Sequence, residues 1–172
     1  MRQVELIETS TFTRQITALL SDEDYGAFQS RLAANPGLGA LIKGGGGKLL
    51  REKIVASASK CFVIVADESK QVEKLGRFPL PVEVIQMAAP LVSDSLQELG
   101  FTPTIRLNRD GTRYITDEGN LILDCSGLLI DNPEEIAARI DSIIGVVEHG
   151  LFLGMADLAV IAGAERVIER TS

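Results

Sequence analysis

The strongest candidate for chemistry in this sequence is a glycine run that follows a lysine and precedes a glutamate. Lys43 is followed by four glycines, Gly44–Gly47, and Glu52 lies just over one turn into the helical pattern that comes next. Glycines let a backbone approach a ligand closely, and the free N–H groups of a helix N-terminus favour an anion. The spacing is neither a Walker motif nor a dinucleotide fingerprint. The plain alternative is a flexible turn with a solvated glutamate between Arg51 and Lys53.

A second candidate is Lys70, which lies just beyond a buried strand predicted at Cys61–Ala66. Ligands of parallel α/β sheets bind at the carboxyl ends of the strands. Lys70 is therefore placed where it could meet a substrate phosphate. The alternative is an exposed loop lysine.

The sequence offers little for metal or nucleophilic chemistry. Cys61 and Cys125 both sit in apolar runs, which predicts two buried small hydrophobes rather than reactive thiols. His149 is the only histidine, and no Cys-x-x-Cys occurs. We therefore predict neither a metal site nor a histidine-dependent triad.

The charge of the chain argues against a nucleic-acid partner. The formal net charge is −7, from 24 acidic and 17 basic residues, and no block of Lys and Arg appears. An anionic small molecule remains compatible, because local cations can outweigh a distant net charge. No apolar stretch reaches the ~18 residues of a membrane helix, and the start has no signal pattern. We expect a cytoplasmic protein that does not bind membranes.

The first half of the chain alternates strand and helix patterns. A short strand is predicted at Val4–Glu8, and helices at about Phe12–Leu20 and from an N-cap at Ser21. After the glycine run, a helix over Leu49–Ala58 feeds the strand Cys61–Ala66. This order indicates an α/β layer with a parallel sheet.

Beyond Pro81 the pattern changes to that of an α+β domain. The pattern predicts six elements in a row. They are a strand at 82–85, a helix at 90–99, strands at 102–107 and 120–125, a helix from Pro133 to about Ile143 capped by Asn132, and a strand at 146–152. The order β-α-β-β-α-β is that of a ferredoxin-like domain. One more buried strand at 157–161 and a short helix complete the prediction.

Five separate motifs lie between residue 41 and the end of the chain. They are Leu41-Ile42-Lys43-Gly44-Gly45-Gly46-Gly47-Lys48, Ala66-Asp67-Glu68-Ser69-Lys70, Phe78-Pro79-Leu80-Pro81-Val82-Glu83-Val84-Ile85, Gly119-Asn120-Leu121-Ile122-Leu123-Asp124 and Gly145-Val146-Val147-Glu148-His149-Gly150-Leu151-Phe152. In their order and spacing these motifs resemble ribose-5-phosphate isomerase type A, and the resemblance runs from residue 41 to residue 172.

The resemblance implies an isomerase that interconverts ribose 5-phosphate and ribulose 5-phosphate without a metal or an organic cofactor. It implies that Glu52 is the general base, which moves a proton between C1 and C2 through an enediolate. Such chemistry needs a carboxylate in reach, and cations or N–H groups where negative charge develops. The resemblance also implies that Lys70 helps to hold the substrate. The reacting oxygens of the substrate would be contacted by Lys43, Gly44, Gly45 and Gly46.

The family carries two further motifs upstream of this stretch, a Thr-Gly-Ser-Thr phosphate loop and an Asp-Gly-Ala-Asp-Glu motif. Neither occurs in this sequence. Residues 1–42 instead resemble the start of RelE-type toxins, at Val4–Thr9, Phe12–Gln15 and Leu32–Pro36. We therefore expect isomerase activity that is very weak or undetectable, with residual binding of ribose 5-phosphate.

The predicted fold class is α/β, with an incomplete Rossmann-like parallel layer and an inserted ferredoxin-like domain. Residues 1–42 form the toxin-like segment, 43–78 and 153–172 the layer, and 79–152 the insertion. The predicted function is ribose-5-phosphate isomerisation in the pentose phosphate pathway. The alternative is a catalytically silent fusion or chimera that binds a partner chain. We expect a homodimer or larger assembly, because an incomplete layer exposes sheet edge or apolar face.

Overall fold

The chain divides into two compact units. Unit 1 comprises Met1–Gly46, Arg51–Val72 and Gly154–Ser172, and unit 2 comprises Gly47–Leu50 and Glu73–Leu153. The structure is a computed structural model, and it describes residues 8–9, 43–44, 49–59, 62–67, 70–162 and 167–171. Among these residues, no helix has both the length and the apolar character needed to cross a bilayer.

The N-terminal part of unit 1 is described at one short pairing. Strand β1 (Glu8–Thr9) runs parallel to β2 (Lys43–Gly44), with Glu8 opposite Lys43 and Thr9 opposite Gly44. The strand predicted at 4–8 lies outside the described residues except for Glu8. The two helices predicted between residues 12 and 34 lie outside them entirely, as does most of the segment that resembles RelE-type toxins.

Unit 1 also contains a three-stranded sheet in the order β3-β8-β9. Helix α3 (Leu49–Ala58) precedes β3 (Val63–Asp67), as the sequence predicts. β3 is parallel to β8 (Leu158–Ala162), and β8 is antiparallel to β9 (Val167–Thr171). The sheet is therefore mixed, with the predicted parallel pairing at β3 and β8.

The short helix predicted after residue 161 is wrong, because the structure places strand β9 there. β9 pairs with β8 in antiparallel register from Ala162 opposite Val167 to Leu158 opposite Thr171. Val167 and Ile168 are β-branched, which favours a strand over a helix. The edge of β8 gives those residues backbone partners that no local pattern reveals.

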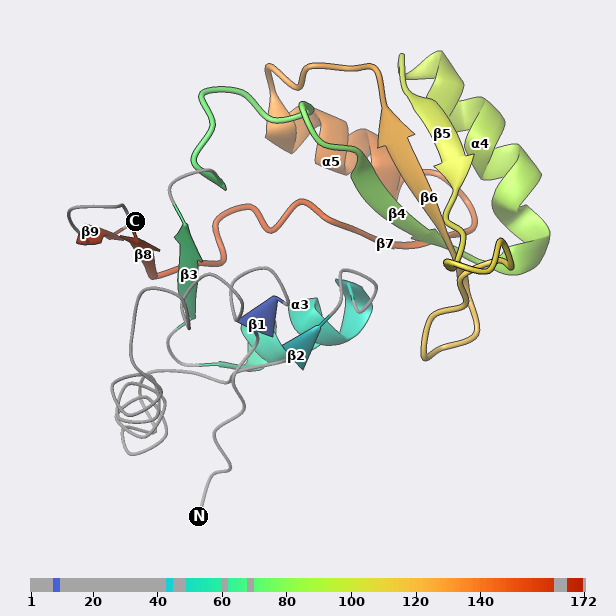
Figure 1. The fold of residues 1–172 in the computed structure, drawn as a ribbon. Helices are drawn as coiled ribbons and strands as arrows, with labels where there is room; N and C mark the ends of the chain where they lie inside the picture. The colour runs from blue at the N-terminus through green and yellow to red at the C-terminus, as the bar shows by residue number, and fades with distance from the viewer. Residues whose placement is uncertain are drawn as a thin grey trace. The chain divides into compact units, whose positions relative to one another are not determined.

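Unit 2 has the predicted element order β-α-β-β-α-β. Its sheet has the strand order β5-β6-β4-β7, and every pairing in it is antiparallel (Figure 1). The elements are β4 (Leu80–Val84), a short 3₁₀ turn η2 (Gln86–Ala88), α4 (Ala89–Glu98), β5 (Thr102–Ile105), β6 (Leu121–Ser126), α5 (Pro133–Asp141) and β7 (Val146–His149).

Helix α5 begins where the sequence predicts. The side-chain oxygen of Asn132 accepts a hydrogen bond from the backbone N–H of Glu135 at 3.2 Å, and Pro133 occupies the first turn. Glu134 and Glu135 in the first turn and Arg139 in the last turn match the helix dipole. These local signals explain why this boundary is predictable.

The two helices of unit 2 cover the same face of its sheet. One apolar cluster contains Val82 and Val84 of β4, Leu121 and Leu123 of β6, and residues of both helices, among them Val92, Leu96, Ala137 and Ile140. Strand residues alternate between the two faces. The side chains between these core positions, including Glu83 and Asp124, therefore belong to the opposite face, where polar contacts gather.

Candidate functional site

The glycine-rich stretch starts from strand β2 and leads to helix α3. Lys43 and Gly44 form β2 through their backbone pairing with β1. Gly45, Gly46, Gly47 and Lys48 lie outside the described residues. Leu49 opens α3 and is buried, with 4% of its surface exposed. Helix α3 and strand β3 follow the glycine run in the order that the sequence predicts, whereas strand β2 before it was not predicted.

Glu52 lies in the first turn of α3, and it is half-buried rather than fully exposed. A carboxylate in a first helical turn is favoured by the helix dipole. Arg51, which precedes Glu52 in the chain, is exposed, and the role of Glu52 stays a prediction.

Lys70 is exposed and follows the carboxyl end of β3, beyond Asp67. Because β3 and β8 are parallel, Lys70 follows the edge of the sheet at which ligands of α/β proteins bind. The described candidates Lys43, Gly44, Glu52 and Lys70 all belong to unit 1.

Asp157 fixes the start of β3, and the sequence alone did not single it out for this role. Its side chain accepts a hydrogen bond from the Phe62 N–H at 2.7 Å, and its own N–H donates to the Phe62 carbonyl oxygen at 2.9 Å. These two bonds join the beginnings of β3 and β8 and set the register that ends near Lys70. An aspartate directly before an apolar strand pattern is the only sequence signal for it.

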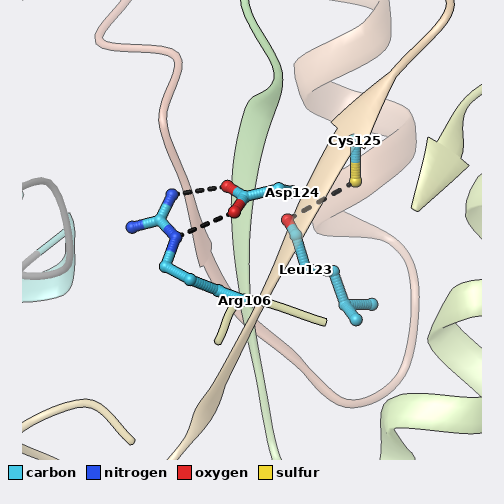
Figure 2. A network of polar contacts seen from close by, with 4 residues as sticks. All are labelled: Arg106, Leu123, Asp124 and Cys125. Carbon is cyan, nitrogen blue, oxygen red and sulfur yellow. Dashed lines mark hydrogen bonds and ion pairs between the residues drawn. The ribbon is translucent and has the colours of Figure 1, made fainter. Parts of the chain in front are cut away.

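On the polar face of unit 2, Arg106 and Asp124 form a bidentate ion pair (Figure 2). Arg106 Nε donates to Asp124 Oδ2 at 2.9 Å, and Nη2 donates to Oδ1 at 2.5 Å. The Arg106 guanidinium also lies 6.0 Å from the centre of the Tyr114 ring. Because the carboxylate already occupies its guanidinium, Arg106 is poorly placed to bind a substrate anion.

Cys125 is buried beside this pair, as predicted, whereas Cys61 lies outside the described residues. The Sγ of Cys125 donates to the Leu123 carbonyl oxygen at 3.6 Å (Figure 2). Burial raises the pKa of the Cys125 thiol to about 12, and the negative charge of Asp124 adds to the rise. At neutral pH this thiol stays protonated, so it is not a nucleophile.

Glu83 is a fully buried carboxylate in the middle of β4. Its Oε1 accepts hydrogen bonds from Thr116 Oγ1 at 2.8 Å and from Asn120 Nδ2 at 3.0 Å. Its Oε2 is buried and has no hydrogen-bond partner in the part of the chain that the structure describes. The carboxylate therefore fastens the turn between Thr116 and Asn120 onto the sheet.

Among the described residues, Asp141, Glu148 and His149 lie close enough to hold a metal ion, with ligand atoms within 4.8 Å of one another. His149 Nδ1 accepts a hydrogen bond from the Leu151 N–H at 3.1 Å, so Nε2 carries the proton. That Nε2 lies 3.2 Å from Asp141 Oδ1. Both ring nitrogens of His149 therefore have partners, and the contact between His149 and Asp141 joins β7 to α5.

Comparisons with known proteins agree on one family. The sequence profile described as "Ribose 5-phosphate isomerase A (phosphoriboisomerase A)" matches residues 35–166. The ribose-5-phosphate isomerase A of Roseiflexus sp. (strain RS-1) is 56% identical over 130 residues, which cover 75% of this chain and 56% of that protein.

Solved structures give the same result. The crystal structure of ribose 5-phosphate isomerase A from Neisseria gonorrhoeae has a TM-score of 0.68 at 45% identity, over 76% of this chain and 57% of that one. A D-ribose-5-phosphate isomerase solved in complex with phospho-erythronic acid has a TM-score of 0.68 at 30% identity, over 72% of this chain and 55% of that one. The chain thus spans a little over half the length of the proteins it resembles.

Proposed function

This chain belongs to the ribose 5-phosphate isomerase A family, and we propose that it binds ribose 5-phosphate and carries the base of the isomerisation to ribulose 5-phosphate. The observation that carries the proposal is the match to the family over residues 35–166. That match runs through β2, α3 and β3, which hold or adjoin every proposed site residue.

In the proposed reaction, the Glu52 carboxylate removes the proton from C2 of the open-chain aldose. The C–H electron pair forms the C1–C2 double bond, and the carbonyl oxygen on C1 becomes an enediolate oxygen. Lys43 and the backbone N–H groups of Gly44, Gly45 and Gly46 would stabilise that oxygen. Glu52 then returns the proton to C1, and the proton of the C2 hydroxyl passes to the oxygen on C1. The C2 oxygen thereby becomes the carbonyl oxygen of the ketose, and no cofactor is consumed.

Lys70 is proposed to hold the substrate through its ammonium group. Two features support this assignment: its exposure and its position after the carboxyl end of β3. A compact point charge on a flexible stem suits a phosphate or sugar oxygen that arrives from solvent.

We propose the following domain organisation. Residues 43–78 and 153–172 form a partial Rossmann-like layer, and residues 79–152 form an inserted ferredoxin-like domain. The strand order β5-β6-β4-β7 with both helices on one face supports the second assignment. Residues 1–42 are proposed to be a segment related to RelE-type toxins.

We also propose that the chain works in the cytoplasm as a homodimer or larger assembly, and that it binds neither nucleic acid nor membranes. A net charge of −7 supports the absence of a nucleic-acid partner. Light scattering at micromolar concentration should give a mass of at least twice the 18.5 kDa of one chain. A monomeric mass would contradict the assembly.

A coupled assay for ribulose 5-phosphate tests the isomerase proposal. Replacing Glu52 with Gln keeps the shape of the side chain and removes the base, so any turnover should fall by about 10²–10⁴-fold. Glu98→Gln, on the exposed side of α4, is the matched control and should leave turnover unchanged. Equal and measurable turnover in the wild type and Glu52→Gln would remove Glu52 from the base role.

The second candidate function is a catalytically silent module that binds a partner chain. It is favoured by the absence of the Thr-Gly-Ser-Thr and Asp-Gly-Ala-Asp-Glu motifs from this sequence. Lack of both turnover and ribose 5-phosphate binding would support this alternative.

A further inference from the structure

Unit 2 contains a cavity of about 230 Å³ that none of the proposed isomerase residues lines. It lies between the N-terminal half of α4 and the strands β5 and β6, and the segment between those strands contributes Arg113 to it. Its volume is that of roughly seven or eight water molecules in the liquid. A ligand of about ten non-hydrogen atoms therefore fits.

The floor of this α4–β5 cavity is apolar. Leu121 and Leu123 of β6 are almost fully buried, and Ile105 and Pro103 of β5 are half-buried beside them. Water in such a space finds few hydrogen-bond partners, so an apolar body that displaces it gains free energy. A sugar would instead leave hydroxyl groups without partners there.

The rim of the α4–β5 cavity carries one cation. Arg113 is exposed, and its guanidinium makes no ion pair with any residue that the structure describes. It differs in this respect from Arg106, whose guanidinium is held by Asp124. Gln86 also lines the cavity, and its side chain is held in place because its Nε2 donates to the Gly119 carbonyl oxygen at 2.6 Å.

We propose that the α4–β5 cavity binds a small monocarboxylate with a compact apolar body, such as an aromatic or branched aliphatic acid. The carboxylate would accept two parallel hydrogen bonds from Arg113, and the body would lie on Ile105, Leu121 and Leu123. One cation at the rim matches one negative charge on the ligand. Phosphate lacks the apolar body that the floor requires.

The proposal does not depend on the isomerase function. All residues that line the cavity belong to unit 2, whereas Lys43, Glu52 and Lys70 belong to unit 1. Binding of a carboxylate can therefore be detected whether or not the chain turns over a sugar phosphate.

Titration of the full chain with benzoate, followed by methyl NMR, tests the proposal. The methyl resonances of Ile105, Leu121 and Leu123 should shift and saturate, with a Kd of about 0.1–1 mM for a ligand of this size. The methyls of Ile140, which is buried in the core but does not line the cavity, should stay in place. If benzoate at concentrations well above this Kd range produced no saturable shifts, the proposal would be overturned.

Four comparisons separate the carboxylate contact from the apolar contact. Arg113→Gln should weaken benzoate binding at least about tenfold. Benzyl alcohol, which lacks the charge, should bind to the wild type as weakly as benzoate binds to Arg113→Gln. Arg109→Gln, on an exposed arginine of the same segment, should change nothing. Ser93→Leu should fill the cavity and abolish binding while the Ile140 resonances report an intact fold.

Two further outcomes would contradict the proposal. Equal affinity of Arg113→Gln and wild type for benzoate would remove the carboxylate contact. Inorganic phosphate that produces the same shifts as benzoate would show a bare anion site, in which the apolar floor plays no part.

Discussion

At the scale of single residues, Cys125 shows how burial produces a pH dependence. Its pKa rises from 9.0 to about 12 on folding. Between these values the unfolded chain releases a proton that the folded chain keeps, so the free energy of unfolding should fall as pH rises from about 9 to about 12. In Cys125→Ala this fall should be smaller, as measured by urea unfolding below and above pH 9. Parallel pH profiles of the two proteins would contradict the assignment.

Glu83 leads to a prediction about a buried side chain. Glu83→Gln keeps the shape of the side chain and an oxygen for Thr116 and Asn120, so stability should change by no more than about 1 kcal/mol. Glu83→Ala leaves both donors without an acceptor and should cost about 2–4 kcal/mol. Chemical denaturation measures both, with the exposed Glu98→Ala as control. An alanine variant as stable as the glutamine variant would show that the carboxylate does not hold the turn.

At the scale of elements, the start of α5 depends on one side chain. Asn132→Ala removes the acceptor for the Glu135 N–H and should lower the free energy of unfolding by about 1 kcal/mol. Asn132→Asp keeps an acceptor and should stay within a few tenths of a kcal/mol of wild type. Urea unfolding of the three proteins checks this, and equal losses in both variants would mean that the cap contributes nothing.

Elements with local signals were predictable from the sequence, and elements defined by distant partners were not. α3 and α5 match their predicted starts, because a glycine run and an Asn-Pro pair mark them. The segment that forms β9 was predicted as a helix. It is a strand because its backbone pairs with β8, and this partner is not visible in the local sequence. β7 was predicted to reach residue 152, yet it ends at His149, because the Leu151 N–H turns to the His149 ring instead of a strand partner.

The same division holds for the polar sites. Lys43, Glu52 and Lys70 came from motifs contiguous in the sequence, and their roles remain proposals. The partners of Glu83 lie more than thirty positions away, and Asp157 contacts Phe62 across 95 positions. The sheet registers that bring these residues together are fixed by packing, which a single sequence does not display.

At the scale of the whole molecule, unit 2 should fold without the rest of the chain. Its core cluster draws on both helices and on the strands β4 and β6. Ile130 donates its N–H to the Leu75 carbonyl oxygen at 2.9 Å, which ties in the segment before β4. The segment Glu73–Leu153 expressed alone should therefore be soluble and give dispersed amide resonances. A collapsed spectrum typical of disorder would show that unit 2 needs unit 1 to fold.

The last prediction concerns catalysis by this 172-residue chain. Loss of one positioning or oxyanion donor typically costs about 10²–10³-fold in rate, and this sequence lacks two motifs that the family uses for such contacts. We expect turnover at least about 10³-fold below that of the Roseiflexus relative assayed alongside it. Calorimetry should still detect binding of ribose 5-phosphate, and Lys70→Ala should weaken that binding about tenfold. Lys74 is an exposed lysine of unit 2, so Lys74→Ala should leave the binding unchanged. Turnover equal to that of the relative would show that other residues of this chain, or a second copy of it, replace the missing contacts.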